Sequence, residues 1–190
     1  AGVPDIDYVT PVGDLSVIDA RFDIVFSPHA IEHQPDLVRH LNDVSALLPS
    51  GGRYHVIVPD KRFTFDHLLP ASTLDEVLAA HDERRVVHTP DAVRAHYEQV
   101  THNEPLLHWM GLHGAREIDR DTSVREKADA AARQAAAGEY IDVHAWIFTP
   151  TNFHNILLAL RQRGLTDLAP VMVSNAKFAA LEFYAILEKA

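Results

Sequence analysis

Two short apolar runs, residues 22–26 and 54–58, stand out in the first third of the chain. Neither run alternates polar and apolar residues, so we expect two parallel strands that helices bury on both faces. Between the runs, apolar residues recur at helical spacing, with Asp36 before them and Pro49 after them. The pattern predicts a right-handed βαβ unit whose strand ends meet at a ligand site. The apolar positions of the expected helix are Leu37, Val38, Leu41, Val44, Leu47 and Leu48.

The middle of the chain, residues 61–140, shows helical patterns and no convincing strand. Helical stretches are expected at residues 73–83, 90–100 and 116–137. We interpret the whole segment as a helical cap inserted into a single domain of residues 1–190. The third stretch is alanine-rich with charges on most sides, so we expect a solvated surface helix, with a partner-facing helix as the alternative.

The end of the chain has the clearest helix signal. Thr149 suits an N-cap, Pro150 suits the first helical position, and Gly164 suits the residue after the last turn. Strands are predicted at residues 171–173 and 176–187, and the Ser-Asn pair between them suits a hairpin turn.

Composition limits the partners and the compartment. The 190 residues carry a formal net charge of -10, which disfavours a nonspecific nucleic-acid binder. The chain has no cysteine, which excludes disulfides, thiol nucleophiles and thiolate metal ligands. No apolar run reaches the roughly twenty residues needed to span a bilayer. We therefore expect no membrane or nucleic-acid partner, a small-molecule substrate, and a cytoplasmic protein.

Several short motifs occur in a fixed order along the chain. They are Phe-Asp-Ile-Val at 22–25, His-Ala-Ile-Glu-His at 29–33, Leu-Leu-Pro-Ser-Gly-Gly-Arg at 47–53, and Val-Pro-Asp-Lys-Arg-Phe-Thr-Phe-Asp at 58–66. Together they resemble the second half of class I S-adenosylmethionine-dependent methyltransferases, namely the fourth strand, its helix and the fifth strand. The resemblance resumes at residues 144–146 and 149–164 and covers about two thirds of the chain.

The resemblance implies an α/β fold, a Rossmann-like sheet with a C-terminal antiparallel hairpin and a helical cap. The family's glycine loop and ribose-binding acidic residue should precede Asp14, where only thirteen residues stand. We therefore expect a sheet that is incomplete on its N-terminal side. Loss of the family's first strands would uncover one edge of the strand at 22–26, which predicts either a homodimer through that edge or a piece of a longer protein.

The resemblance also implies which residues serve the cofactor, S-adenosylmethionine. Asp14 matches the carboxylate that accepts a hydrogen bond from the adenine amino group, and a plain turn role is the alternative. Ser27 and His29 leave the fourth strand where cofactor and substrate meet. The cofactor-binding residues implied are Asp14, Leu15, Ser27 and His29.

The reaction itself needs little from the protein, because the sulfonium already activates the methyl group. An imidazole or carboxylate near the strand end could act as general base, although Glu32 and His33 could instead hold the loop in place. The catalytic candidates are His29, Glu32 and His33; the substrate-binding candidates are Lys61, Arg62 and His144. The expected acceptor is a small molecule or a saccharide-type compound. Trp146 is expected in the core rather than in the cleft.

Two alternative functions use the same residues. The sequence His29-Ala30-Ile31-Glu32-His33 satisfies the H-x-x-E-H pattern of inverted zinc peptidases, with Glu98, Glu104 or Glu117 as a downstream ligand. Pro28 and Pro35 bracket this motif and leave less than two helical turns, which argues against it. The other alternative is a non-catalytic methyltransferase-like domain that acts through dimerisation. The thirteen histidines otherwise show no ligand spacing, so we predict no metal site and expect the cap histidines to be surface or satisfied residues.

Overall fold

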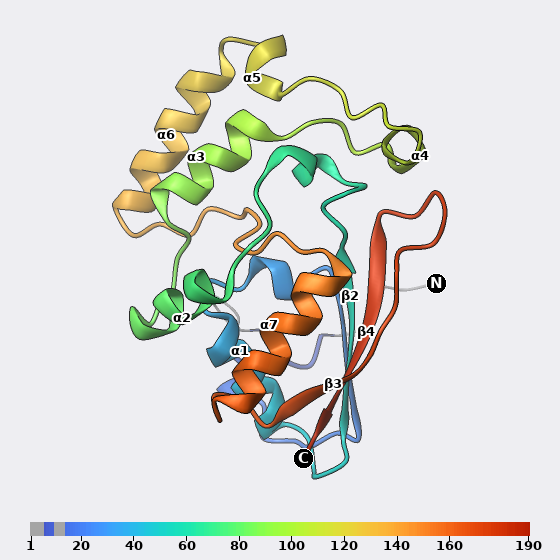
Figure 1. Ribbon diagram of the computed structural model, residues 1–190. Helices are drawn as coiled ribbons and strands as arrows, with labels where there is room; N and C mark the ends of the chain where they lie inside the picture. The colour runs from blue at the N-terminus through green and yellow to red at the C-terminus, as the bar shows by residue number, and fades with distance from the viewer. Residues whose placement is uncertain (1–5, 10–13) are drawn as a thin grey trace.

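The computed structural model describes residues 6–9 and 14–190 and has one four-stranded mixed sheet (Figure 1). The strand order is β1-β2-β4-β3. Strand β1 (Ile24–Pro28) pairs in parallel with β2 (Arg53–Pro59), and β4 (Glu182–Lys189) lies antiparallel between β2 and β3 (Leu168–Val173). The chain is therefore an α/β protein, as the alternation of strand and helix patterns predicted.

The predicted βαβ unit is present. Helix α1 (Leu37–Ala46) joins β1 to β2, and the Asp36 carboxylate accepts a hydrogen bond from Arg39 N as its N-cap. Gly51, with φ of 77°, forms the turn that leads from the helix into β2. The predicted strand at 22–26 is displaced by two residues, because regular pairing begins at Ile24, although the Asp23 carbonyl already accepts a hydrogen bond from Arg53 N of β2 at 2.9 Å.

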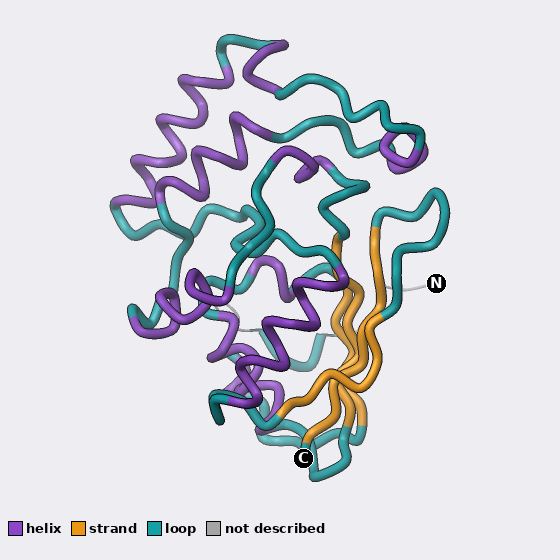
Figure 2. Tube along the Cα trace, in the orientation of Figure 1, coloured by secondary structure: helices purple, strands orange, loops and turns teal. Residues whose placement is uncertain are grey.

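Helices cover one face of the sheet, which corrects the expectation of strands buried on both faces. Helices α1 and α7 (Pro150–Gln162) lie together on one side of the strands (Figure 2). Tyr54, Val56 and Val58 of β2 point into that side and are buried. Ile24 and Phe26 of β1 point the other way and are 58% and 62% exposed. The apolar residues of the two runs are therefore not all buried, and the exposed ones follow the preference of β-strands for branched and aromatic side chains.

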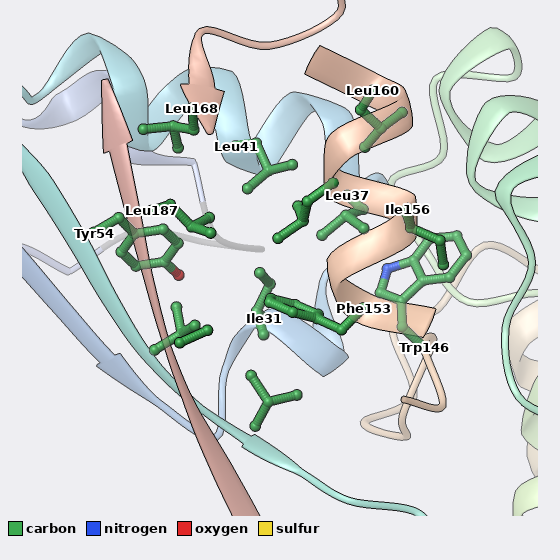
Figure 3. Packing of buried hydrophobic residues seen from close by; sticks show 14 of the residues in the cluster. Ile31, Leu37, Leu41, Tyr54, Trp146, Phe153, Ile156, Leu160, Leu168 and Leu187 are labelled. Atoms are coloured by element: carbon green, nitrogen blue, oxygen red, sulfur yellow. The ribbon is translucent and has the colours of Figure 1, made fainter. Parts of the chain in front are cut away.

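The main core fills the space between this sheet face and the helices (Figure 3). Aromatic rings of Phe153, Phe148 and Phe183 pack edge to face at its centre. Trp146 belongs to the core and is 3% exposed, as expected. Other buried members include Ile31, Leu37, Leu41, Tyr54, Ile156, Leu160, Leu168 and Leu187.

The inserted segment is helical, as predicted, and has no strand among its residues 61–140, all of which the structure describes. Val77 and Ala80 of α2 are buried in the main core, so this helix packs on the sheet layer. The remaining helices lie beyond the end of the sheet layer, and the one at residues 105–109 approaches the connection before β4, where Trp109 Nε1 donates to Ala180 O (Figure 1). The α-helices of the inserted segment are α2 (Leu74–Asp82), α3 (Pro90–Gln99), α4 (Pro105–Trp109), α5 (Glu117–Arg120) and α6 (Val124–Ala136). It also contains the 3-10 turn η4 (Phe65–Leu68), while the 3-10 turns η2 (Leu15–Val17) and η3 (Ile31–His33) precede it.

The expectation of a solvated surface helix at 116–137 was wrong for one face of the stretch. The stretch breaks after α5, and α6 packs against α3 through buried alanines. A second, small core forms there from Val93, Ala131, Ala135 and Val143. Alanines at this spacing let two helices approach closely, so a face with few large apolar residues is still an interior face.

The C-terminal part of the chain, from Thr149 onward, has the predicted helix, but its strands differ from the prediction. Thr149 caps α7, and its side chain and that of Asn152 satisfy each other's backbone N–H groups. The predicted two-residue turn was wrong, since residues 174–181 connect β3 to β4. Phe178 in this connection is 74% exposed, so part of the apolar run at 176–187 is loop.

Candidate functional site

The loop that leaves β1 carries the motif at residues 29–33 to the carboxyl end of the parallel strands. His29 has φ of 47°, a left-handed conformation that turns the chain sharply after the strand. Its backbone N–H still donates to Ile57 O of β2 at 3.0 Å. The next residues form only the single turn η3 before α1 begins. The imidazole of His29 is thereby placed at the sheet edge and Glu32 beneath it.

A buried carboxylate, that of Glu32, lies at the centre of the site. The Glu32 side chain is 1% exposed, and its Oε1 lies 3.5 Å from His29 Nδ1 and 4.0 Å from His33 Nε2. Neither oxygen of Glu32 has a hydrogen-bond partner among the described residues. The His144 ring packs edge to face on the His33 ring, with centroids 4.7 Å apart. Three histidines therefore surround one buried acidic group.

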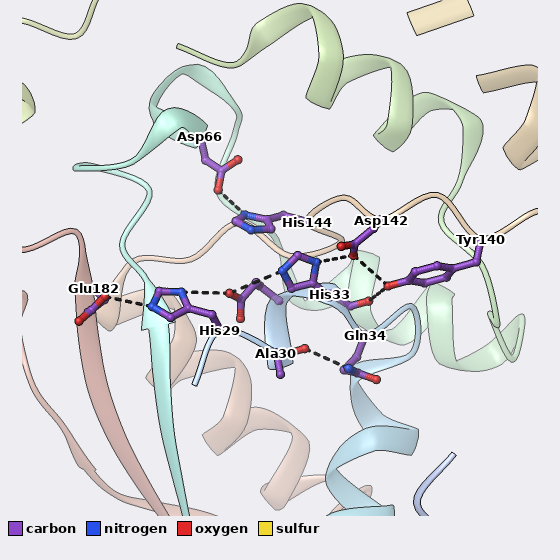
Figure 4. A network of polar contacts seen from close by, with 10 residues as sticks. His29, Ala30, His33, Gln34, Asp66, Tyr140, Asp142, His144 and Glu182 are labelled. Atoms are coloured by element: carbon purple, nitrogen blue, oxygen red, sulfur yellow. Dashed lines mark hydrogen bonds and ion pairs between the residues drawn. The ribbon is translucent and has the colours of Figure 1, made fainter. Parts of the chain in front are cut away.

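Each of these histidines also meets a second carboxylate on its other side (Figure 4). His29 Nε2 lies 3.0 Å from Glu182 Oε2, and His144 Nδ1 lies 2.6 Å from Asp66 Oδ2. His33 Nδ1 lies 2.9 Å from Asp142 Oδ1, a close ion-pair distance off the line of a good hydrogen bond. The Glu182 and Asp66 carboxylates fix the orientations of the His29 and His144 rings and hold a proton on the nitrogens that face them, whereas Asp142 acts on His33 through its charge.

Burial governs the charges of the site. Removal from water raises the pKa of Glu32, and the neighbouring histidines oppose this shift. For His144, burial works against the charged ring, but the Asp66 hydrogen bond and its negative charge prevail and raise the pKa of the imidazole. Burial lowers the pKa of His96, whose ring centroid is 6.3 Å from that of His144. The site thus holds ionisable groups whose pKa values are shifted by burial and by neighbouring charges.

An apolar groove of about 400 Å³ runs along β1 beside this site. Leu15 and Ser27, two of the predicted cofactor residues, line it together with Ile18. Asp14 caps η2 and accepts hydrogen bonds from both the backbone and the hydroxyl of Ser16, which is the turn role left open by the sequence. The residues before Asp14, where the family's glycine loop was expected to be missing, lie partly outside the described part of the chain.

The predicted substrate residues behave differently from one another. His144 joins the buried site, as described above. Arg62 binds Asp60 through two hydrogen bonds of 2.9 and 2.6 Å, and Lys61 Nζ donates to His67 O at 2.8 Å. Both cations are therefore held by the loop that contains them, and their side chains already have partners.

The zinc-peptidase motif does not have the context that this mechanism needs. His29 precedes η3, and only Glu32 and His33 lie on that single 3-10 turn, so the two histidines do not share a face of an α-helix. The carboxylates that approach the motif are Asp142 and Glu182, and the proposed downstream ligands lie elsewhere in the inserted segment.

Sequence reasoning missed the spatial grouping of histidines and acids. In the described part of the chain, two sets of side chains have ligand atoms within 4.8 Å of one another: Glu32, His33 and His144, and His67, His108 and His113. His88 is buried with its Nε2 unpaired, contrary to the expectation of surface or satisfied cap histidines, whereas the buried His108 has a partner for each ring nitrogen and agrees with it. Asp66, Asp142 and Glu182 gave no spacing signal, because they lie 34 to 150 residues from Glu32 in sequence. Of these three acidic residues, only Asp66 belongs to a motif that carries the family resemblance, the one at residues 58–66.

Two further observations complete the description. None of the helices in residues 6–9 and 14–190 is long and apolar enough to cross a membrane. No protein-family model, curated protein or solved structure matches this chain.

Proposed function

We propose that this chain provides the acceptor side of an S-adenosylmethionine-dependent methyltransferase. One observation carries the proposal: a single loop, residues 27–34, lines two adjoining sites. Ser27, Ala30 and Gln34 line the apolar groove, while His29 and Glu32 belong to the polar site. A nucleoside cofactor needs the first kind of surface, and a methyl acceptor with an exchangeable proton needs the second.

The strand arrangement supports the same proposal. Strands β1 and β2 are parallel and joined through α1, as the family's fourth and fifth strands are, and the last strand runs antiparallel to them. The outer edge of β1 pairs with no other strand in the described residues, which agrees with a sheet that lacks the family's first strands. The groove lies along this edge.

His29 is the residue that we assign as general base. Its side chain is 40% exposed, so an acceptor can reach it, whereas Glu32 lies behind it and is buried. Glu182 binds Nε2, so Nδ1, which makes no hydrogen bond to Glu32, is the nitrogen that would take the acceptor's proton, and the two carboxylates would stabilise the positive ring that forms. Because the sulfonium supplies the reactive methyl group, the protein needs only to align the acceptor and exclude water.

The proposal predicts that S-adenosylhomocysteine binds the groove. In isothermal titration we expect a micromolar dissociation constant for the unmodified chain. Ile18→Glu places a carboxylate on the apolar wall and should weaken binding at least about tenfold, since an unpaired buried charge is costly. Val17→Glu is the matched control, because Val17 is a neighbour that is 48% exposed and does not line the groove.

The outcomes separate the candidate functions. Binding that Ile18→Glu weakens and Val17→Glu leaves intact supports the methyltransferase. Absence of nucleoside binding contradicts the proposal for this chain. If sedimentation then showed a stable dimer that Phe26→Glu dissociates, the non-catalytic alternative that acts through the β1 edge would take its place.

A further inference from the structure

The buried Glu32 carboxylate is the least satisfied polar group of the site. Its side chain is 1% exposed, and both of its oxygens lack hydrogen-bond donors within the described chain. Leaving a buried carboxylate without a partner costs several kcal/mol, so stable folds normally supply a proton, a donor or a cation. The nearest nitrogens, on His29 and His33, stand at 3.5 and 4.0 Å, which is too far for hydrogen bonds.

The two histidines beside Glu32 are oriented as metal ligands are. Asp142 lies 2.9 Å from His33 Nδ1, and Asp66 lies 2.6 Å from His144 Nδ1. The hydrogen bond to Asp66 holds a proton on His144 Nδ1 and leaves Nε2 of that ring with a free lone pair. Asp142 favours the same tautomer at His33 through its charge alone, since no hydrogen bond joins His33 Nδ1 to a partner in the described chain. Histidines that bind metal almost always donate their other N–H to a carboxylate, a backbone carbonyl or water, which fixes the ring and makes the ligating nitrogen a better donor.

The spacing of the three groups fits one ion. Ligand atoms of Glu32, His33 and His144 all lie within 4.8 Å of one another. Around a tetrahedral zinc with bonds of about 2.0–2.2 Å, neighbouring ligand atoms lie roughly 3.4 Å apart. The 4.0 Å between His33 Nε2 and Glu32 Oε1 would therefore close by only a few tenths of an ångström per side chain.

We propose that Glu32, His33 and His144 bind one divalent transition-metal ion, and that zinc is the ion that suits them. Two imidazoles and one carboxylate are a ligand set that catalytic zinc sites use, with the fourth position open to water or substrate. Zinc at this place would neutralise the orphaned carboxylate. If the proposed methyl transfer holds, a bound ion would polarise the acceptor's oxygen or nitrogen and lower its pKa.

The test is a zinc titration of the full chain at pH 7.5, freed of metal beforehand, followed by calorimetry. We expect one tightly bound ion in the unmodified chain. Glu32→Gln removes the anionic ligand with little change of shape and should weaken zinc binding at least about a hundredfold, more than loss of an outer residue does. Glu139→Gln makes the same chemical change at an exposed position and should leave the affinity unchanged.

Two further variants serve as controls for the interpretation of the zinc titration. Asp66→Asn leaves all three ligands in place but weakens the outer contact to His144, so it should reduce zinc affinity by about 10- to 100-fold. His113→Ala disrupts the second histidine group, and the tight site should survive this change. Circular dichroism of each metal-free variant verifies that it is folded.

The proposal is overturned if Glu32→Gln and Glu139→Gln bind zinc equally well, or if only His113→Ala removes the tight site. Visible absorption of bound Co²⁺ gives an independent reading, because its bands depend on ligand type and geometry. Loss of those bands in Glu32→Gln, with retention in Glu139→Gln, supports the site. None of these measurements requires the nucleoside groove, so failure here and failure of the methyltransferase proposal are distinguishable.

Discussion

Acidification from pH 6.5 to pH 4 should destabilise the protein by about 3 kcal/mol through His40 alone. His40 is buried between α1 and the sheet, and its Nε2 lies 2.9 Å from the Tyr54 hydroxyl. Burial lowers the pKa of this imidazole to about 4 from its ordinary value of 6.5. The folded protein therefore keeps His40 neutral in a range where the unfolded chain protonates it.

The sign of the effect follows from proton binding. Below pH 6.5 the unfolded state takes up a proton at His40 that the folded state refuses, so falling pH favours unfolding. The contribution of His40 to stability is complete above pH 6.5 and is lost as the pH falls toward 4. His88, whose pKa burial also lowers to about 4, should act in the same window.

His40→Gln is the variant that measures this contribution, because the amide can still bond the Tyr54 hydroxyl but does not titrate. Urea unfolding at pH 7 and pH 4.5 should show a smaller loss of unfolding free energy for this variant than for the unmodified chain. His55→Gln, at a half-buried position of β2, is the control and should follow the parent profile. Identical acid sensitivity of His40→Gln and the parent would contradict the assignment.

The sequence could predict the elements whose signals are local. Asp36 before α1 and the Thr149-Pro150 pair before α7 act within one helical turn, so their effect does not depend on distant residues. The strand ends were harder, since Phe178 is apolar yet lies in the connection before β4. Which sheet face is covered depends on where the helices pack, and an apolar run cannot show this.

The residues of the candidate site also fall into two groups, those that the local sequence could predict and those that it could not. His29, Glu32 and His33 could be predicted because they follow a strand directly, and polar residues at that place gather at a ligand site. Asp66 and Asp142 could not, because the contacts that give them a role come from separate segments that only the tertiary fold brings to the histidines. The sequence likewise showed a charged helix where α6 provides an alanine face to α3.

Replacement of Trp146 should strongly lower the free energy of unfolding, because this residue joins the core to the loop that carries Glu32 and Gln34. Its ring is 3% exposed, and Nε1 donates to Gln34 O at 2.6 Å. The backbone N–H groups of Ala145 and Trp146 both donate to Glu32 O, at 2.7 and 3.1 Å. We expect Trp146→Ala to lower the free energy of unfolding by about 3–5 kcal/mol, the range for deleting a large buried aromatic side chain.

Two comparisons separate packing from the hydrogen bond in urea unfolding. Trp146→Phe keeps much of the ring volume but leaves the Gln34 carbonyl without its donor, so it should cost about 1–3 kcal/mol. Trp109→Ala removes the other tryptophan, which is half-buried, stacks on Phe63 and donates to Ala180 O at 2.9 Å. Its cost should be clearly smaller, and an equal cost would contradict the role given to Trp146.

The milder variant also tests whether core and site are mechanically connected. Three hydrogen bonds hold residues 32–34 to the segment 145–146, and Trp146→Phe removes only the one at Gln34. If that bond positions the loop, Trp146→Phe should weaken zinc binding severalfold while Trp109→Ala leaves it unchanged. If Trp146 has only a structural role, both variants should lower stability and neither should change the affinity for zinc. A lower zinc affinity in Trp146→Phe alone would therefore show that Trp146 positions the site.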